Sequence, residues 1–238
     1  MPSSPRTRIL GTTLRSARIE ANFGLRELAR RIGIAPAVLS SWEQARRIPN
    51  ISDVACILGA IGATGHAKRD ILRLASGTPG ESWVVHGAPL SPARTTALLT
   101  HGLAAHSVVT WNPLVIPELL HVIHQRPEPC STPIEAFISD RAFDADDTSV
   151  ATLRRQLHSL PRSATSGSQL LTLRIVQAEL AWRSGLITAF DRYSMPDGGI
   201  VIYYSQRDAG ILIADQDTPP SHCETDIKIL RKIAHPQI

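Results

Sequence analysis

The stretch LRELARRIGIAPAVLSSWEQARRIPN (residues 25–50) decides the fold of the first part of the chain. Apolar residues recur at helical spacing on both sides of Gly33, and Pro36 follows that glycine by three residues. Glycine adopts the positive φ that a tight helix exit requires, and proline is favoured in the first turn of a helix. The stretch therefore predicts two short helices joined by a sharp turn.

The residues around this turn predict how the two helices pack. Gly24 is placed as the N-cap of the first helix, and Glu27 can reach back to its free amides. Small Ala29 allows the helices to cross closely, while Leu39 and Trp42 face inward from the second helix. This is helix–turn–helix geometry, which leaves one polar face of the second helix free to enter the major groove of double-stranded DNA.

Residues 10–50, LGTTLRSARIEANFGLRELARRIGIAPAVLSSWEQARRIPN, resemble the Cro/repressor-type (XRE) helix–turn–helix domain, including the trailing WEQARRIP. In that family an arginine of the first helix pairs with the glutamate that ends the recognition helix. Arg18 and Glu43 occupy these positions, so the resemblance implies a partly buried pair that orients the two helices. The resemblance completes a five-helix domain, with the remaining helices expected at residues 8–21, 51–63 and 66–76.

Arginines flank the second helix, and its outer face carries small polar side chains. Arg26, Arg46 and Arg47 are predicted to contact phosphates, together with backbone amides at helix N-termini. On the outer face only Gln44 can bind an adenine through two hydrogen bonds. The predicted DNA-binding residues are Arg26, Pro36, Ala37, Ser40, Ser41, Gln44, Arg46 and Arg47.

Two positions depart from the family pattern. Ala35 stands where serine or threonine usually caps the recognition helix, which weakens the cap by roughly 1 kcal/mol. Ala45 stands where glycine usually follows the glutamate, and we expect it to reshape the loop that carries the two arginines. We therefore expect binding that depends strongly on salt and is poorly selective per monomer, with specificity coming from a homodimer on a two-part operator.

Composition and charge limit the remaining possibilities. The 238 residues are 43% apolar and 19% charged, as in globular proteins, and no run approaches the roughly 20 apolar residues of a membrane-spanning helix. Residues 1–79 hold 12 Lys/Arg against 5 Asp/Glu, a net charge of +7, whereas residues 80–238 hold 13 against 16, a net charge of −3. A basic N-terminal segment followed by a slightly acidic remainder predicts a polyanion-binding module joined to a domain with a second function.

The cysteines and the N-terminus favour a cytoplasmic protein without membrane contact. Cys56, Cys130 and Cys223 are odd in number and far apart, which matches neither a disulfide framework nor a zinc site. The opening MPSSPRTRIL lacks the apolar core of a signal peptide.

The second half of the chain predicts a mixed α+β domain with a mainly antiparallel sheet. The expected domains are residues 1–76 (helix–turn–helix), 77–93 (a linker anchored by Trp83) and 94–238 (a domain that binds a partner or ligand). Helices are expected at residues 91–106, 115–125, 148–160 and 224–234. Strands are expected at residues 134–139, 169–176, 185–193, 198–205 and 210–215.

Four segments of this half resemble a C-terminal domain of unknown function found in actinobacterial, antitoxin-like XRE regulators. They are NPLVIPELLHVIHQ (112–125), FISDRAF (137–143), LRRQLHSL (153–160) and LLTLRIVQAE…GLITAFDRY (170–193). The resemblance implies a domain that binds a small protein encoded nearby. Glu118, His121 and Arg141 replace the family's usual glycine, glutamine and second acid, so any groove formed there is altered.

Catalytic and metal-binding patterns are weak. Glu118, His121 and His124 share one helix face, but the His-Glu-x-x-His pattern of catalytic zinc sites is absent, so a solvated or partner-facing face is preferred. The chain has no phosphate-cradling glycine loop and no nucleophile elbow, and its lysines are poorly placed for a Ser/Lys protease. We expect no enzyme activity, no cofactor and no metal. An acidic cluster is expected to cap the helix at 148–160: Asp140, Asp144, Asp146 and Asp147.

The sequence thus predicts a dimeric, DNA-binding transcriptional regulator whose C-terminal domain binds a protein partner. The alternative is a repressor that responds to a small molecule, with aromatic residues lining a pocket instead of only packing in the core. These residues are Trp111, Trp182, Tyr193, Tyr203 and Tyr204. An enzyme tethered to DNA is the third and least favoured possibility.

Overall fold

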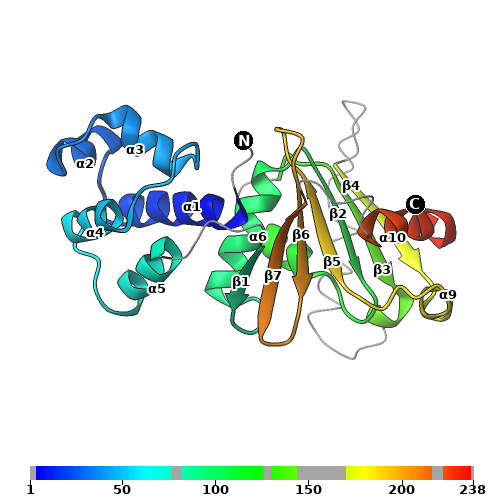
Figure 1. Cartoon of the computed structure of the whole chain (residues 1–238). Coiled ribbons are helices and arrows are strands. Elements are labelled where there is room, and N and C mark those ends of the chain that lie inside the picture. The colour runs from blue at the N-terminus through cyan, green and yellow to red at the C-terminus, as the bar shows by residue number, and fades with distance from the viewer. Residues whose placement is uncertain (1–3, 77–81, 126–129, 144–169, 216–221, 237–238) are drawn as a thin grey trace. The chain divides into compact units, whose positions relative to one another are not determined.

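The computed structural model describes residues 4–76, 82–125, 130–143, 170–215 and 222–236, and it divides the chain into two compact units, Met1–Trp83 and Val84–Ile238 (Figure 1). No helix in these described ranges is long and apolar enough to cross a membrane.

Over residues 4–76 the N-terminal unit folds into five α-helices, as the sequence predicts (Figure 1). They are α1 (Pro5–Glu20), α2 (Leu25–Arg31), α3 (Pro36–Glu43), α4 (Ile51–Ala60) and α5 (Gly65–Ser76). Gly33 takes a φ of +73° at the exit of α2, and the amide of Ile34 donates to the carbonyl of Ala29 at 3.0 Å. Asn50 and Asp53 exchange side-chain to backbone hydrogen bonds of 2.8 and 3.2 Å, forming a capping box at the start of α4.

Two close contacts hold α1 in this unit. Gly11 lies directly against the end of α3. A Cβ atom at this position would stand 2.7 Å from the carbonyl oxygen of Trp42 and 2.8 Å from that of Glu43, so only glycine fits without a shift. At the start of α1, the Arg6 guanidinium donates to the carbonyl of Leu74 in the last turn of α5. The last carbonyl groups of a helix have no hydrogen-bond donor within the helix, and Arg6 supplies one here.

The C-terminal unit is built on a mixed sheet whose strand order is β1-β7-β6-β5-β2-β3-β4-β8 among the described residues. The strands are β1 (Ser82–His86), β2 (Ser107–Asn112), β3 (Ile134–Ser139), β4 (Leu171–Val176), β5 (Phe190–Ser194), β6 (Ile200–Ser205), β7 (Ala209–Asp215) and β8 (His235–Pro236). β3 runs parallel to both β2 and β4, while the pairs β2–β5, β5–β6, β6–β7 and β4–β8 are antiparallel. The predicted α+β class with a mainly antiparallel sheet is confirmed.

Helices pack on both faces of this sheet. They are α6 (Pro92–Ala104), α7 (Glu118–His124), α9 (Ala178–Arg183) and α10 (His222–Ile233), with a 3₁₀ turn, η1, at Asp140–Phe143. Trp111 and Phe190, opposite each other in the β2–β5 ladder, share a core with residues of α9 and α10. Tyr193 points to the other face, where its ring lies 5.7 Å from that of His101 on α6.

The structure differs from the sequence expectations at four places. Part of the expected linker 77–93 is strand β1, where Val85 is buried because the strand joins the sheet. Strand β2 and helix α9 were not expected at all. The strand expected at 185–193 begins only at residue 190, because Gly185 ends α9 at a φ of +76°. The helix expected at 148–160 lies outside the described residues.

Candidate nucleic-acid interface and buried polar cluster

Helix α3 presents an open outer face and is held from behind. Leu39 is fully buried and Trp42 nearly so. On the other side Pro36, Ala37 and Gln44 are exposed, while Ser40 and Ser41 are half-buried. The face on which the sequence places the base-contacting residues is therefore open within this unit.

An ion pair orients α3 on α1. The Nε of Arg18 donates to Oε1 of Glu43 at 2.7 Å, and its Nη2 donates to Oε2 at 2.8 Å. Its Nη1 also donates to the carbonyl of Phe23 at 2.9 Å, just before α2. The hydrogen bond to Glu43 raises the pKa of Arg18. One nearly buried guanidinium thus connects α1, α3 and the entry to α2, since such bidentate pairs are strongly directional.

Hydrogen bonds already engage part of the polar face of α3. The amide of Gln44 donates to Oγ of Ser40 at 3.1 Å, and Oγ of Ser41 donates to the carbonyl of Val38 at 2.7 Å. The hydroxyl proton of Ser41 is therefore turned back onto its own helix. Gln44 and Ser40 lie together as one hydrogen-bonding group.

Exposed arginines stand before and after α3 in the chain. Arg26 lies in the first turn of α2, and Arg46 and Arg47 lie in the loop after α3. The structure adds Arg30 and Arg31 at the end of α2, which are also exposed and which sequence reasoning did not single out. The Arg31 guanidinium lies 5.3 Å from the centre of the Phe23 ring.

The loop after α3 contains a strained residue. Ala45 has a φ of +57°, a left-handed conformation that costs a residue with a Cβ atom roughly 1–2 kcal/mol. Its amide donates to the carbonyl of Trp42 at 3.1 Å, and the amide of Arg46 donates to that of Ser41 at 2.9 Å. At the other end of α3, Ala35 offers no side-chain hydrogen bond as N-cap. Ala45 thus adopts a backbone conformation that glycine takes without this penalty, so the loop keeps its shape at a cost in stability.

We expect Ala45→Gly to raise the free energy of unfolding of the N-terminal unit by about 1 kcal/mol, because glycine adopts a positive φ without the steric penalty. Urea unfolding followed by circular dichroism measures the change. Ala37→Gly is the matched control, since it makes the same substitution inside α3 and should destabilise by about 1 kcal/mol. Equal destabilisation by both variants would show that Ala45 is unstrained.

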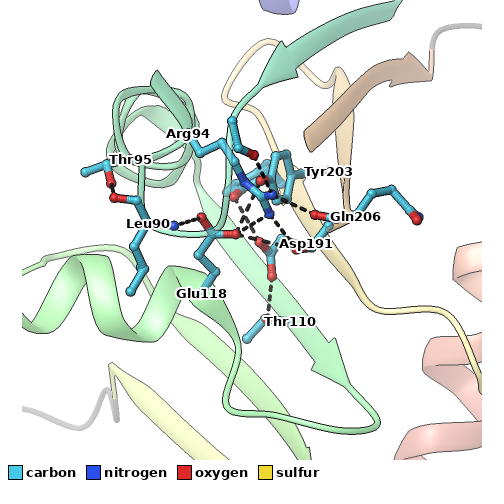
Figure 2. Close-up of polar contacts among 11 residues, drawn as sticks. Leu90, Arg94, Thr95, Thr110, Glu118, Asp191, Tyr203 and Gln206 are labelled. Atoms are coloured by element: carbon cyan, nitrogen blue, oxygen red, sulfur yellow. Dashed lines mark hydrogen bonds and ion pairs between the residues drawn. The ribbon is translucent and has the colours of Figure 1, made fainter. Parts of the chain in front are cut away.

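A second polar site lies inside the C-terminal unit, around the guanidinium of Arg94 on α6 (Figure 2). Arg94 is fully buried, and its Nη2 lies 2.5 Å from Oε2 of Glu118 and 2.6 Å from Oγ of Ser205. Its Nη1 donates to the carbonyls of Gln206 at 2.7 Å and Gly87 at 3.2 Å. The arginine therefore joins α6, the start of α7 and the turn after β6.

Glu118, considered above as a metal ligand, is the anion of this pair. Its Oε1 accepts a hydrogen bond from the backbone amide of Leu90 at 2.7 Å, and its Oε2 accepts from the Tyr203 hydroxyl at 3.4 Å. Among the described residues no three His, Cys, Asp or Glu side chains lie close enough to share a metal ion. Asp140, from the acidic cluster, accepts from the amide of Ala178 at 2.9 Å and so caps α9.

Asp191 lies beside this pair on β5 and is almost completely buried. The hydroxyl of Thr110 donates to its Oδ1 at 2.5 Å, and that of Tyr193 approaches its Oδ2 at 3.5 Å. Burial raises the pKa of Asp191 to about 7, and the nearby charge of Glu118 adds to the rise, while the Thr110 hydrogen bond opposes it. Asp191 is thus a carboxyl group that titrates near neutral pH.

A small pocket opens at this cluster. Its lining includes Asp191, Glu118, Ser205 and Tyr203. Trp111 and Phe190 also border it, although their side chains belong to the core on the other face of the sheet. The space available to the centre of a water molecule is about 10 Å³, which is room for one water-sized group. Of the aromatic residues proposed above to line a pocket, only Trp111 and Tyr203 do so here.

The open α3 face, the buried pair behind it and the flanking arginines define a helix–turn–helix DNA-binding protein. Residues 9–71 match a protein family described as a helix-turn-helix domain. The chain is therefore a DNA-binding transcriptional regulator.

Among solved structures, the chain is similar to the crystal structure of the clp gene regulator ClgR from C. glutamicum, with 31% identity and a TM-score of 0.27. That likeness covers 34% of this chain and 99% of the other. No curated protein matches the chain.

Proposed function

We propose that this regulator acts in the cytoplasm as a homodimer and binds a two-part DNA site through α3. The observation that carries the proposal is the exposed outer face of α3, with Trp42 and the Arg18–Glu43 pair holding the helix from behind. A second unit bound one helical turn away, at a spacing of about 34 Å, would double the number of groups that read the sequence.

The side chains on α3 support the need for a dimer. Ala37 offers a methyl group to a thymine, and the Ser40–Gln44 pair offers one amide group, while Ser41 uses its proton within the helix. Few groups are left to discriminate between bases. Phosphate contacts by Arg26, Arg46 and Arg47 therefore supply most of the binding free energy of one monomer.

We expect the double variant Arg46→Ala/Arg47→Ala to make the slope of the logarithm of the association constant against the logarithm of salt concentration less negative by about 2. The reason is that each lost phosphate contact removes about one released counterion. The measurement is fluorescence anisotropy, on a duplex first located by footprinting the region upstream of the regulator's own gene. The control is Arg183→Ala/Arg207→Ala, which removes the same charge from two exposed arginines of the C-terminal unit and should leave the slope unchanged. An unchanged slope in the Arg46/Arg47 variant contradicts this placement.

We further propose that the C-terminal unit binds a small partner protein encoded nearby, as in antitoxin-like regulators. Exposed apolar side chains in the loops beside the pocket support this, with Leu114 71%, Val115 58% and Ile187 60% exposed. The alternative, a small-molecule sensor, has less support because the pocket has room for only one water-sized group. Co-purification with the product of an adjacent short reading frame tests the partner, whereas thermal stabilisation by metabolites would favour the sensor.

A further inference from the structure

Strand β1 forms an open edge of the sheet. It lies beside β7, and no other strand pairs with it among the described residues (Figure 1). The amide of Gly87, just after β1, donates to the carbonyl of Asp208, just before β7, at 2.9 Å. The end of one strand thus meets the start of the other, so the two strands run antiparallel.

The outward edge of β1 consists of the backbone groups of Ser82, Val84 and His86. Backbone groups of successive residues face opposite sides of a strand, and Gly87 donates toward β7, so those of residues 82, 84 and 86 face away from β7. All three residues are exposed. Within the described ranges no group hydrogen-bonds to these N–H and C=O groups, so they are open to pairing with another strand.

This edge lacks the features that usually keep sheet edges from pairing. The five residues of β1 include no proline, lysine, arginine, aspartate or glutamate. At the opposite end of the sheet, β8 has two residues, and one of them is Pro236, which has no amide hydrogen. Of these two end strands, β1 is therefore the one suited to pairing with another chain.

The sequence of β1 matches a second copy of the same strand. In antiparallel pairing about Val84, each copy donates three hydrogen bonds and accepts three, between the two Val84 residues and between Ser82 and His86. Trp83 then stands opposite Val85, which is an aromatic and β-branched pair of the kind that stabilises sheets. No like charges meet along the strand, so the edge is complementary to itself.

Exposed apolar side chains beside this edge would be covered at the same time. Counting back along both strands from the hydrogen bond between their ends places Ser82 opposite Ile213. Val84 shares that face, since it lies two residues from Ser82. Val84 is 40% exposed and Ile213 is 37% exposed. Pairing about Val84 therefore brings these side chains of both copies together in one apolar strip.

The place of β1 in the chain also fits a dimer that binds DNA. Five residues, 77–81, connect α5 to β1. In the paired strands the two Ser82 residues would lie about 14 Å apart along the strand direction, and each connection can reach about 17 Å. Together these lengths exceed the spacing of about 34 Å between half-sites one helical turn apart. Two DNA-binding units tethered in this way can reach successive half-sites.

We propose that this regulator dimerises through β1, which pairs antiparallel with β1 of a second copy about Val84 and joins the two sheets into one. The inference rests on the proposed function, in which the regulator is a homodimer, and it names the surface that the two copies share.

Sedimentation velocity of the full chain tests this interface. We expect the wild type to be dimeric and Val84→Lys to raise the dimer dissociation constant at least tenfold, because two lysines would stand opposite each other across the dimer axis. Val84→Pro should do the same, because it removes an outward N–H at an edge position where proline is tolerated. Thermal unfolding of each variant checks that it is folded.

Two matched variants should stay dimeric. Val84→Thr keeps the β-branched shape and the backbone N–H. Trp182→Lys adds the same charge as Val84→Lys at another exposed position of the same unit, where the wild-type side chain is 73% exposed. If Val84→Lys and Val84→Pro dimerise as tightly as these two controls, the inference is overturned.

A cysteine at position 84 tests the register. Opposed residues that exchange hydrogen bonds have Cα atoms about 5.5 Å apart, which lies within the range of a disulfide. Val84→Cys, made together with Cys56→Ser to remove an exposed thiol, should therefore form a disulfide-linked dimer under mild oxidation. Leu114→Cys in the same background places a thiol at an exposed site elsewhere and should remain unlinked. Failure of Val84→Cys to link contradicts pairing about Val84.

The outcomes separate this inference from the proposed homodimer. If the wild type is dimeric and the Val84 variants remain so, the copies meet elsewhere, and only this inference fails. If the wild type is monomeric both alone and on a duplex with two half-sites, the homodimer fails and this inference fails with it.

Binding to DNA gives an independent readout. Val84→Lys should bind a duplex with two half-sites no more tightly than a duplex with one, whereas Trp182→Lys should keep the wild-type preference for two. An unchanged preference in Val84→Lys counts against β1 as the contact between copies.

Discussion

Arg94→Met is expected to lower the free energy of unfolding of the C-terminal unit by roughly 3–5 kcal/mol, the largest single effect in this molecule. The substitution leaves the Glu118 carboxylate buried without its cation, and it leaves the carbonyl of Gln206 and Oγ of Ser205 without their donor. The remaining carboxyl group must then take up a proton or draw water into the core. Urea unfolding followed by tryptophan fluorescence measures the loss.

Two comparison variants isolate the cause. Arg183→Met breaks an ion pair of similar length, 2.6 Å to Glu179, but both side chains are more than 70% exposed, so the change should cost under about 1 kcal/mol. The double variant Arg94→Met/Glu118→Met removes both buried charges and should recover much of the loss. If the double variant is less stable than Arg94→Met alone, uncompensated charge is not the reason for the cost.

Gly11→Ala is the second substitution with a large expected effect, a loss of about 1–3 kcal/mol in the N-terminal unit. The new methyl group would stand under 3 Å from two backbone carbonyl oxygens, those of Trp42 and Glu43, which have no rotamer that moves them aside. Helices α1 and α3 must therefore move apart, and the Arg18–Glu43 pair must lengthen. DNA affinity should fall together with stability, which anisotropy and thermal unfolding measure on the same sample.

Gly59→Ala is the matched control for this effect. Gly59 lies in α4 with nothing within 4 Å of the point where the new methyl group would stand, so alanine should stabilise the helix by up to about 1 kcal/mol through its higher helix propensity. Opposite signs for the two substitutions attribute the loss at Gly11 to close packing. The same sign for both would contradict it.

The N-terminal unit could be predicted from the sequence because its signals are local. The turn at Gly33, the proline that opens α3 and the inward positions of Leu39 and Trp42 all lie within ten residues of one another. The pairing of Arg18 with Glu43 spans 25 residues and was expected only through the family resemblance.

The polar cluster of the C-terminal unit could not be predicted in the same way. Glu118 shares a helix with two histidines, so local spacing favoured a solvated or partner-facing helix face over a metal site. Glu118 is buried instead, because its partner Arg94 stands 24 residues earlier on another helix. Strand β2 was missed because both of its faces are covered, which removes the alternation of polar and apolar residues that marks a half-exposed strand. Asp191 appears in the sequence as an ordinary strand residue, and only the tertiary fold buries it.

The hydrogen bonds of Arg94 also bear on how the chain folds during synthesis. Its acceptors at Ser205 and Gln206 lie 111 and 112 residues further along, close to the end of the unit. A growing chain therefore keeps this guanidinium hydrated until β6 has left the ribosome. The contacts described above for the N-terminal helices, by contrast, join residues within the first 76. The N-terminal helices can therefore fold well before the C-terminal unit is complete.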